Sequence, residues 1–174
     1  QALPQNATTK MLIHEAVAAL NSVSKTAETF RAEMQRLAEL LPEYQIVMDM
    51  YGVGPATGPQ LMAEIGDVRR FSHRGALIAY AGVDPQPSES GKQRRNSDPI
   101  SRKGSGLIRK VLFQVMDIHL RKSPANEPVY QFLDRKRGEG KPHFVYMTAG
   151  ANKFLRIYYA RVKEQMNALP DYEG

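Results

Sequence analysis

Apolar side chains recur at alternating steps of three and four residues through residues 10–41. This stretch contains neither proline nor glycine, and Pro42 ends it. The spacing is that of a heptad seam held through four repeats, which is typical of a coiled coil or a long helical hairpin arm. An amphipathic helix that packs on its own domain fits equally well, because two seam positions are alanines and the seam is thin. As a coiled coil, the arm would pair two copies of the protein. The seam consists of Ile13, Ala16, Leu20, Val23, Ala27, Phe30, Met34, Leu37 and Leu41.

Beyond Pro42 the apolar residues occur in shorter runs with helical spacing, separated by glycine and proline. No stretch alternates apolar and polar residues as a half-buried strand does. The sequence therefore predicts an all-α protein, with a coiled-coil or linker helix in residues 1–42 and a helical domain in residues 43–174. The runs predict helices over residues 43–50, 56–65, 74–81, 107–120, 128–133 and 143–169, with a basic turn at residues 135–138.

A glycine-rich turn, Tyr51-Gly52-Val53-Gly54-Pro55, separates the first two of these shorter helices. An apolar–Gly–apolar–Gly sequence between two short helices is the pattern of a helix-hairpin-helix unit, which grips a nucleic-acid backbone without reading its sequence. Glycine lets the main chain approach a phosphate closely, and the amides of the next helix supply donors and a favourable dipole. Gly52, Val53 and Gly54 are therefore candidate backbone-binding residues. The alternative is an ordinary tight turn in a helical domain.

Residues 82–109 contain few apolar side chains and combine glycine, proline and serine with basic residues. Segments of this length without regular structure are uncommon in compact domains and are usually functional or disordered. The net charge of the chain is +6, with a balance of −4 in residues 1–68, +9 in residues 69–137 and +1 in residues 138–174. Most of the basic residues in the middle third are arginines, whose planar guanidinium suits phosphate recognition. This local basicity predicts a polyanionic partner, nucleic acid.

Composition and motifs argue against several other classes of protein. The absence of cysteine excludes a disulfide scaffold and a thiolate metal site, and it fits a cytoplasmic protein. The four histidines are scattered without metal-ligand spacing, no tight acidic cluster suggests a Mg²⁺ site, and no nucleotide-binding loop is present. No apolar run is long enough to span a membrane, and no signal-peptide pattern opens the chain. Because the first residue is Gln1, we expect the chain to be part of a longer protein.

Ser90 is the candidate nucleophile of the serine-rich segment. A serine that attacks a phosphodiester needs cations to neutralise the charge that develops on the phosphate, and several basic residues lie near Ser90 in the sequence. Gly91 would let the main chain approach a nucleic-acid backbone. Because Ser-Gly pairs are common in loops, the alternative is that Ser90 has no chemical role. The candidate phosphate-binding residues are Lys92, Arg94, Arg95, Arg102, Lys103 and Arg109.

Five blocks occur in an order that resembles the C-terminal domain of the IS110 family of insertion-sequence transposases, which are related to Piv-type DNA invertases. The resemblance covers residues 48–163, and the heptad stretch before it resembles the coiled-coil segment that joins the two halves of these transposases. The sequence departs from the usual pattern at Ser105, where an asparagine often follows Lys-x-Gly. The blocks are Tyr51-Gly-Val-Gly-Pro, Ala63-Glu-Ile-Gly-Asp-Val-Arg-Arg-Phe, Ala79-Tyr-Ala-Gly-Val-Asp-Pro, Ser90-Gly, and Ile100-Ser-Arg-Lys-Gly with Leu107-Ile-Arg.

In that family an N-terminal RNase-H-like domain carries acidic metal ligands, and the C-terminal domain supplies a nucleophilic serine. The resemblance therefore implies that Ser90 is this serine, that DNA strands are exchanged through a covalent phosphoserine link, and that Mg²⁺ belongs to the acidic domain. It also implies guidance by a structured non-coding RNA. Dimers and tetramers would join the acidic domain of one protomer to the serine domain of another. On this interpretation the chain alone cannot recombine DNA.

The rival interpretation is a non-catalytic module, in which the hairpin and the basic segment hold DNA or structured RNA and Ser90 is only a loop residue. Both interpretations predict binding that weakens steeply with salt, because each neutralised phosphate releases counterions. They differ in whether Ser90→Ala abolishes strand transfer while leaving binding intact. A serine hydrolase has little support, because no histidine–carboxylate pairing is visible for it.

Overall fold

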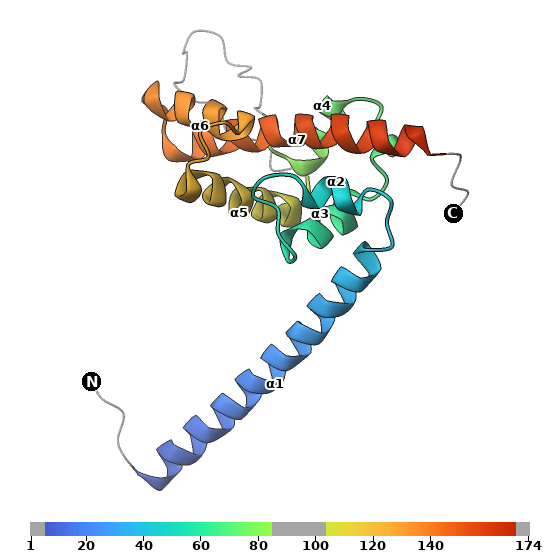
Figure 1. The fold of residues 1–174 in the computed structure, drawn as a ribbon. Coiled ribbons are helices and arrows are strands. Elements are labelled where there is room, and N and C mark those ends of the chain that lie inside the picture. Colours follow the sequence, from blue (N-terminus) through green and yellow to red (C-terminus); the bar gives the residue numbers. More distant parts are fainter. Residues whose placement is uncertain (1–5, 85–103, 170–174) are drawn as a thin grey trace.

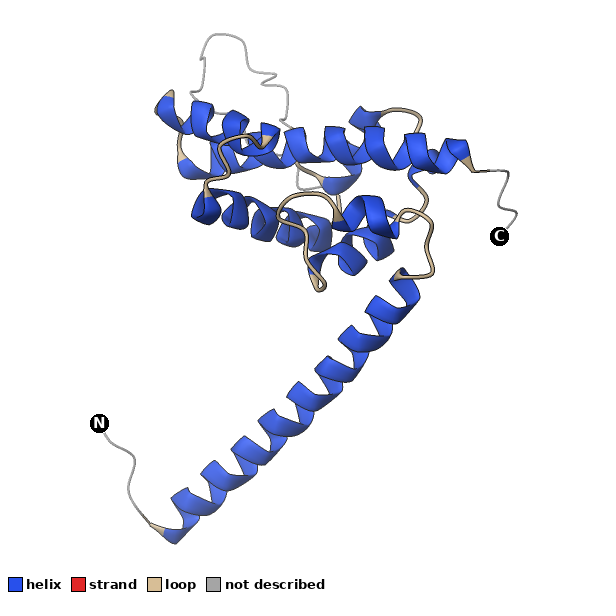
Figure 2. Cartoon of the chain, in the orientation of Figure 1, coloured by secondary structure: helices blue, strands red, loops and turns tan. Residues whose placement is uncertain are grey.

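The computed structural model describes residues 6–84 and 104–169. Within these ranges the chain consists of helices and connecting turns, with no strand, as the sequence predicts (Figure 2). Most helix ends lie within a few residues of the predicted ones. The α-helices are α1 (Ala7–Ala38), α2 (Tyr44–Met48), α3 (Thr57–Ile65), α4 (Arg74–Ala81), α5 (Gly106–Lys122), α6 (Pro128–Gly138) and α7 (His143–Ala168), and the short 3₁₀-helix η1 spans Val68–Arg70.

The helices α2 to α7 form a helical body in which α7 is the central element (Figure 1). This helix contacts α2, α4, α5, α6 and η1. Its buried residues recur at steps of three and four, so they share the side of the helix that faces its neighbours. The largest fully buried side chains of the body are Leu61, Ile65, Leu77, Ile108, Leu112, Met116, His119, Leu133, Met147, Phe154, Leu155 and Tyr158.

The first helix, α1, projects away from this body as a single rod (blue in Figure 1). It has 32 residues, and Ala38 at its carboxyl end is its buried residue. Seam residues such as Leu20 and Phe30 are each 67% exposed. The predicted helix is therefore confirmed, and over most of its length it does not pack on its own domain. Pairing of the seam with a second copy stays a prediction. Neither α1 nor any other helix in the described ranges is long and apolar enough to cross a membrane.

The prediction of a basic turn at residues 135–138 is wrong, because α6 continues to Gly138. The apolar pattern stops at Leu133, but basic side chains favour the carboxyl end of a helix, where they meet its partial negative charge. Two of them also form ion pairs, Lys136 Nζ with Glu139 Oε2 at 2.7 Å and Arg137 with Asp134 at 2.6 Å. Charge thus extends α6 by a turn that hydrophobic periodicity does not reveal.

Candidate nucleic-acid interface

The chain enters and leaves residues 85–103 at one point, beside the carboxyl end of α4. The Ser105 amide donates to the Tyr80 carbonyl oxygen at 2.8 Å, and the backbones of Gly82 and Gly104 are in contact. A Cβ at Gly104 would overlap the Tyr80 carbonyl oxygen and lie 2.6 Å from the Gly82 nitrogen. Because glycine alone has no Cβ, only glycine fits this crossing. We call residues 80–82 and 104–105 the neck.

Arg109 of α5 ties the two sides of the neck together. Its Nη1 donates to the carbonyl oxygen of Ala81 at 3.2 Å and to that of Gly104 at 3.0 Å. Ala81 belongs to one side of the neck and Gly104 to the other, so a single guanidinium holds both. The sequence predicts Arg109 as a phosphate-binding residue. Its Nη1 is engaged with these carbonyls, and binding of phosphate by its other nitrogens stays a prediction.

Ser105 connects the neck to α3. Its Oγ accepts a hydrogen bond from the Ile108 amide at 3.2 Å and donates one to Glu64 Oε2 at 2.9 Å. A hydroxyl can do both at once, so Ser105 caps α5 and anchors α3. On the other side of the neck, Asn152 Nδ2 donates to the Val83 carbonyl oxygen at 2.7 Å. Sequence reasoning missed Glu64 and Asn152, because both are distant from the neck in sequence and no local pattern marks them.

The candidate nucleophile and most candidate phosphate-binding residues fall between the two sides of the neck. Their roles stay predictions, because the structure does not describe residues 85–103. The described residues do show how this segment is attached: both of its ends emerge from the helical body beside the amino end of α5. The predicted residues outside the described ranges are Ser90, Lys92, Arg94, Arg95, Arg102 and Lys103.

The predicted backbone-binding turn lies between α2 and α3 and packs against α5. Gly52 has a φ of 83°, and a Cβ there would lie 3.0 Å from both Val115 Cγ1 and His119 Cε1. Gly52 is thus required by the packing of the turn itself. At Gly54 a Cβ would meet nothing within 4 Å, and the Gly54 amide donates to Thr57 Oγ1 at 2.8 Å. The Gly54 side of the turn is open to a ligand, and nucleic-acid binding there stays a prediction.

A buried histidine lies beneath this turn. The His119 ring has its Nδ1 2.8 Å from the Val115 carbonyl oxygen and its Nε2 3.0 Å from Glu127 Oε2. The second contact has the length of an ion pair but lacks the alignment of a hydrogen bond. Glu127 also caps α6, since its Oε2 accepts from the Tyr130 amide at 2.7 Å. His119 therefore joins the turn to the start of α6.

Two arginines of the basic middle third have partners inside the fold. Arg69 Nη2 lies 2.9 Å from Asp67 Oδ2, and hydrogen bonds from Arg69 lower the pKa of the Asp67 carboxyl. The guanidinium of Arg70 lies over the rings of Phe71 and Tyr80, at 4.4 and 4.5 Å from their centroids. Part of the positive charge in the middle third therefore stabilises the body beside the neck.

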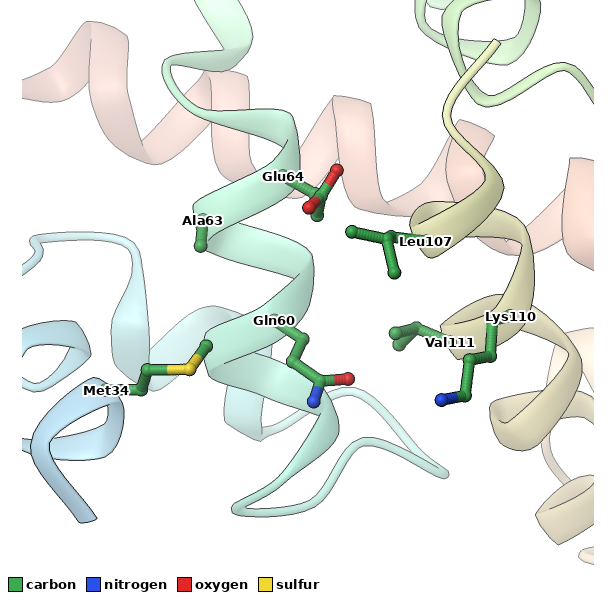
Figure 3. Close-up of a pocket in the computed structure, with 7 residues that line it drawn as sticks. All are labelled: Met34, Gln60, Ala63, Glu64, Leu107, Lys110 and Val111. Carbon is green, nitrogen blue, oxygen red and sulfur yellow. The ribbon is translucent and has the colours of Figure 1, made fainter. Parts of the chain in front are cut away.

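A small pocket lies between α3 and α5 (Figure 3). Its volume is about 220 Å³. The side chains of Gln60 and Glu64 extend from α3 toward α5, and Ala63 lies on the side of α3 nearer Met34 (Figure 3). The α5 side of the pocket is formed by Leu107, Lys110 and Val111. This lining suits an apolar side chain better than a phosphate. The pocket is lined by Met34, Gln60, Ala63, Glu64, Leu107, Lys110 and Val111.

No group of three or more histidine, aspartate or glutamate side chains in the described ranges is placed to hold a metal ion. Mg²⁺ prefers octahedral coordination by oxygen and is usually bound through carboxylates. The assignment of Mg²⁺ to a separate acidic domain stays a prediction.

The family model of the IS116/IS110/IS902 transposases matches residues 44–131, about half of the chain. The chain belongs to this transposase family. The matched region contains the turn, the neck and the walls that α3 and α5 give to the pocket. Both α1 and α7 lie outside it.

Curated relatives of this transposase family come from insertion elements and from gene-inverting systems. The chain is 24% identical over 162 residues to an insertion element IS110 protein of Streptomyces coelicolor, which covers 93% of this chain and 39% of that protein. It is 29% identical over 127 residues to the pilin gene-inverting protein of Moraxella bovis, with 72% and 38% covered. The protein of that name from Moraxella lacunata is 31% identical over 114 residues, with 65% and 34% covered. The chain thus spans well under half the length of these relatives.

Proposed function

We propose that this chain is the C-terminal, serine-bearing part of a DNA transposase or recombinase, and that Ser90 is its nucleophile. Membership of the transposase family and likeness to pilin gene-inverting proteins support DNA strand exchange as the reaction. The partial coverage of the relatives supports a longer protein, whose other domain carries the metal-binding acids. The observation on which the proposal rests is the neck, which attaches both ends of the segment containing Ser90 to the helical body.

In the proposed reaction, Ser90 Oγ attacks the phosphorus of a DNA phosphodiester. A serine–phosphate ester forms while the bond from phosphorus to one sugar oxygen breaks, and the serine proton goes to that leaving oxygen. The number of phosphate ester bonds is unchanged, so the hydroxyl of another strand can reverse the step without an external energy source. Basic side chains stabilise the negative charge of the transition state. We assign this role to Lys92, Arg94, Arg95, Arg102, Lys103 and the nitrogens of Arg109 other than Nη1.

The neck supports this role in physical terms. Reacting atoms have to be brought to about 3–3.5 Å in an aligned geometry. A nucleophile therefore benefits when the segment that carries it is attached at a fixed position. At the neck, Arg109 and the Ser105–Tyr80 hydrogen bond fix both ends of the segment. The 17-residue helix α5 begins there, and its N-cap Ser105 is held by the Glu64 carboxylate of α3.

We further propose that helix α1, the arm, pairs copies of the longer protein. Ser90 of one protomer would then meet the acidic domain of another. The exposed apolar seam of α1 supports this assembly, because an unpaired seam leaves large apolar side chains in water. A structured guide RNA is the proposed second polyanion, on the basis of the family resemblance and the basic middle third.

The test uses the full-length protein that contains this chain, incubated with donor DNA, target DNA, Mg²⁺ and its RNA. A denaturing gel would detect a covalent protein–DNA adduct in the wild type, Ser90→Ala and Ser88→Ala. Ser88 is the matched control, since it is a serine two residues away in the same segment. We expect the adduct in the wild type and in Ser88→Ala, and its complete loss in Ser90→Ala.

An adduct that persists in Ser90→Ala would show that another residue is the nucleophile. Strand exchange that proceeds in the wild type without any adduct would assign the chemistry to the acidic domain. This chain would then be the non-catalytic binding module.

A further inference from the structure

A basic groove with a volume of about 790 Å³ runs between α4 and α7. Four basic residues line it, Arg74 from α4 and Lys153, Arg156 and Arg161 from α7, against one acidic residue, Asp84. The lining therefore has a surplus of three positive charges. Such a surplus attracts a polyanion.

The basic side chains of the groove have no polar partner in the described part of the chain: none forms an ion pair or a side-chain hydrogen bond there. Basic residues elsewhere in the described ranges form ion pairs with nearby carboxylates, among them Arg69 with Asp67 and Lys136 with Glu139. Arg156 and Arg161 are also exposed, and Lys153 is half-buried. The charges of the groove thus remain available to a ligand.

The spacing of these residues suits a repeating anion. Lys153, Arg156 and Arg161 line the same groove from one helix, and the rise of an α-helix places the first and last about 12 Å apart along its axis. Phosphates of one DNA strand advance about 3.4 Å per nucleotide along the duplex axis. Because a strand winds around that axis, its successive phosphates lie further apart than this rise. The α7 wall can therefore meet more than one phosphate but fewer than the axial rise alone would give, and Arg74 adds a cation from the opposite wall.

The groove includes the point where the described chain ends before the segment that contains Ser90. Asp84, which lines the groove, is the last described residue before that segment. Asn152, another lining residue, binds the Val83 carbonyl oxygen and so fixes the chain at this point. A strand lying in the groove would therefore run past the root of the serine segment.

We propose that this groove binds the phosphate backbone of the DNA strand next to the bond that Ser90 attacks. The inference rests on the proposed function for the identity of the strand as DNA. It adds a binding surface built from α4 and α7, whose α7 wall lies outside the matched family region and outside the basic middle third of the sequence.

The test measures binding of this 174-residue chain to a fluorescent duplex DNA of arbitrary sequence by anisotropy, at several salt concentrations. The double variant Lys153→Glu/Arg156→Glu is compared with Lys25→Glu/Arg31→Glu, which makes the same charge change on the exposed face of α1. We expect the groove variant to bind at least about tenfold more weakly, and its log–log salt slope to fall by about two, at about 0.9 per lost phosphate contact. The α1 variant should retain the wild-type slope.

Equal weakening in both double variants, or none in the groove variant, would overturn the inference. Lys153→Ala/Arg156→Ala keeps the test valid if charge reversal disturbs folding, which circular dichroism and thermal unfolding would reveal. A parallel titration with duplex RNA of the same sequence identifies the polyanion. Loss of RNA binding with unchanged DNA binding would overturn the assignment to DNA.

The binding test is independent of the serine chemistry, because Ser90→Ala should bind as the wild type does. If the groove variant binds DNA more weakly than the α1 variant but no adduct forms, Ser90 is not the nucleophile and the groove proposal still holds. An adduct that forms together with an unchanged groove variant would refute the groove alone.

Discussion

Helix α1, the arm, and the helical body both carry apolar residues at helical spacing. These side chains are buried in the body but exposed on the arm. In the body, Leu112 and Phe154 are 0% and 1% exposed, whereas Leu20 and Phe30 of α1 are both 67% exposed. The helices of the body therefore bury their apolar faces against one another as they pack around α7. In this chain the exposed face of α1 has no such cover.

This difference shows that an identical sequence pattern can describe two kinds of surface. Periodicity tells which side of a helix is apolar, but it does not tell what covers that side. For α5 and α7 the cover is the rest of the body. For α1 the exposed seam favours another polypeptide, because burial of apolar side chains is the main driving force for association.

The largest effect should come from truncating a core residue of the body. We expect Leu112→Ala to lower the free energy of unfolding by about 2–5 kcal/mol, through lost apolar burial and a cavity. Leu20→Ala, the same chemical change on the exposed arm, should lower that of the body by less than about 0.5 kcal/mol. Urea unfolding followed by near-ultraviolet absorption of the body's tyrosines would measure both. Equal losses would contradict the contrast between arm and body.

An intermediate effect should come from the turn between α2 and α3, where two glycines differ in their surroundings. Gly52→Ala should destabilise the body by about 1–3 kcal/mol, because the positive φ is unfavourable for alanine and its Cβ would crowd Val115 and His119. Gly54→Ala has open space around the new Cβ and should change stability little. The same unfolding measurement ranks the two variants. A larger loss for Gly54→Ala would show that the two sides of the turn are assigned wrongly.

The smallest effect on the body should come from charging the seam of α1. Leu20→Asp/Phe30→Asp should leave the unfolding of the body unchanged and dissociate any oligomer that the arm forms, because charges in a coiled-coil seam oppose burial. Sedimentation equilibrium of the wild type and the variant measures the assembled mass. Asn21→Asp/Ser24→Asp is the control, with the same charge change off the seam. A wild type that stays monomeric at all concentrations would contradict an arm that pairs copies by itself.

The sequence identifies the helices well, since apolar spacing and the positions of proline and glycine mark nearly every helix. It places the end of α6 wrongly, because Lys136 and Arg137 extend that helix through charge rather than through apolar contacts. The neck could not be predicted. Ser105 and Glu64 are 41 residues apart, and their contact depends on how α3 and α5 pack.

The charge balance of each sequence region is also a poor guide to which basic residues line the groove. The middle third has the largest positive balance, yet Arg69, Arg70 and Arg109 of that region have partners inside the fold. Lys153 and Arg156 lie in a region whose overall balance is only +1, and they gather beside Arg74 only when α4 packs along α7. A face-by-face count of charge on the last helix would have been a better signal than a regional sum.

The neck also has an evolutionary consequence. The hydrogen bonds of Arg109 and Ser105 set the separation of the two chain ends from outside the intervening segment. These hydrogen bonds do not themselves depend on how many residues lie between the two ends. For an unconstrained chain, doubling the length of such an insertion costs only about 0.6 kcal/mol of closure entropy. A change in the length of the chain between Asp84 and Gly104 therefore costs the fold little, and selection on this segment would act through the proposed chemistry of Ser90 and its basic neighbours.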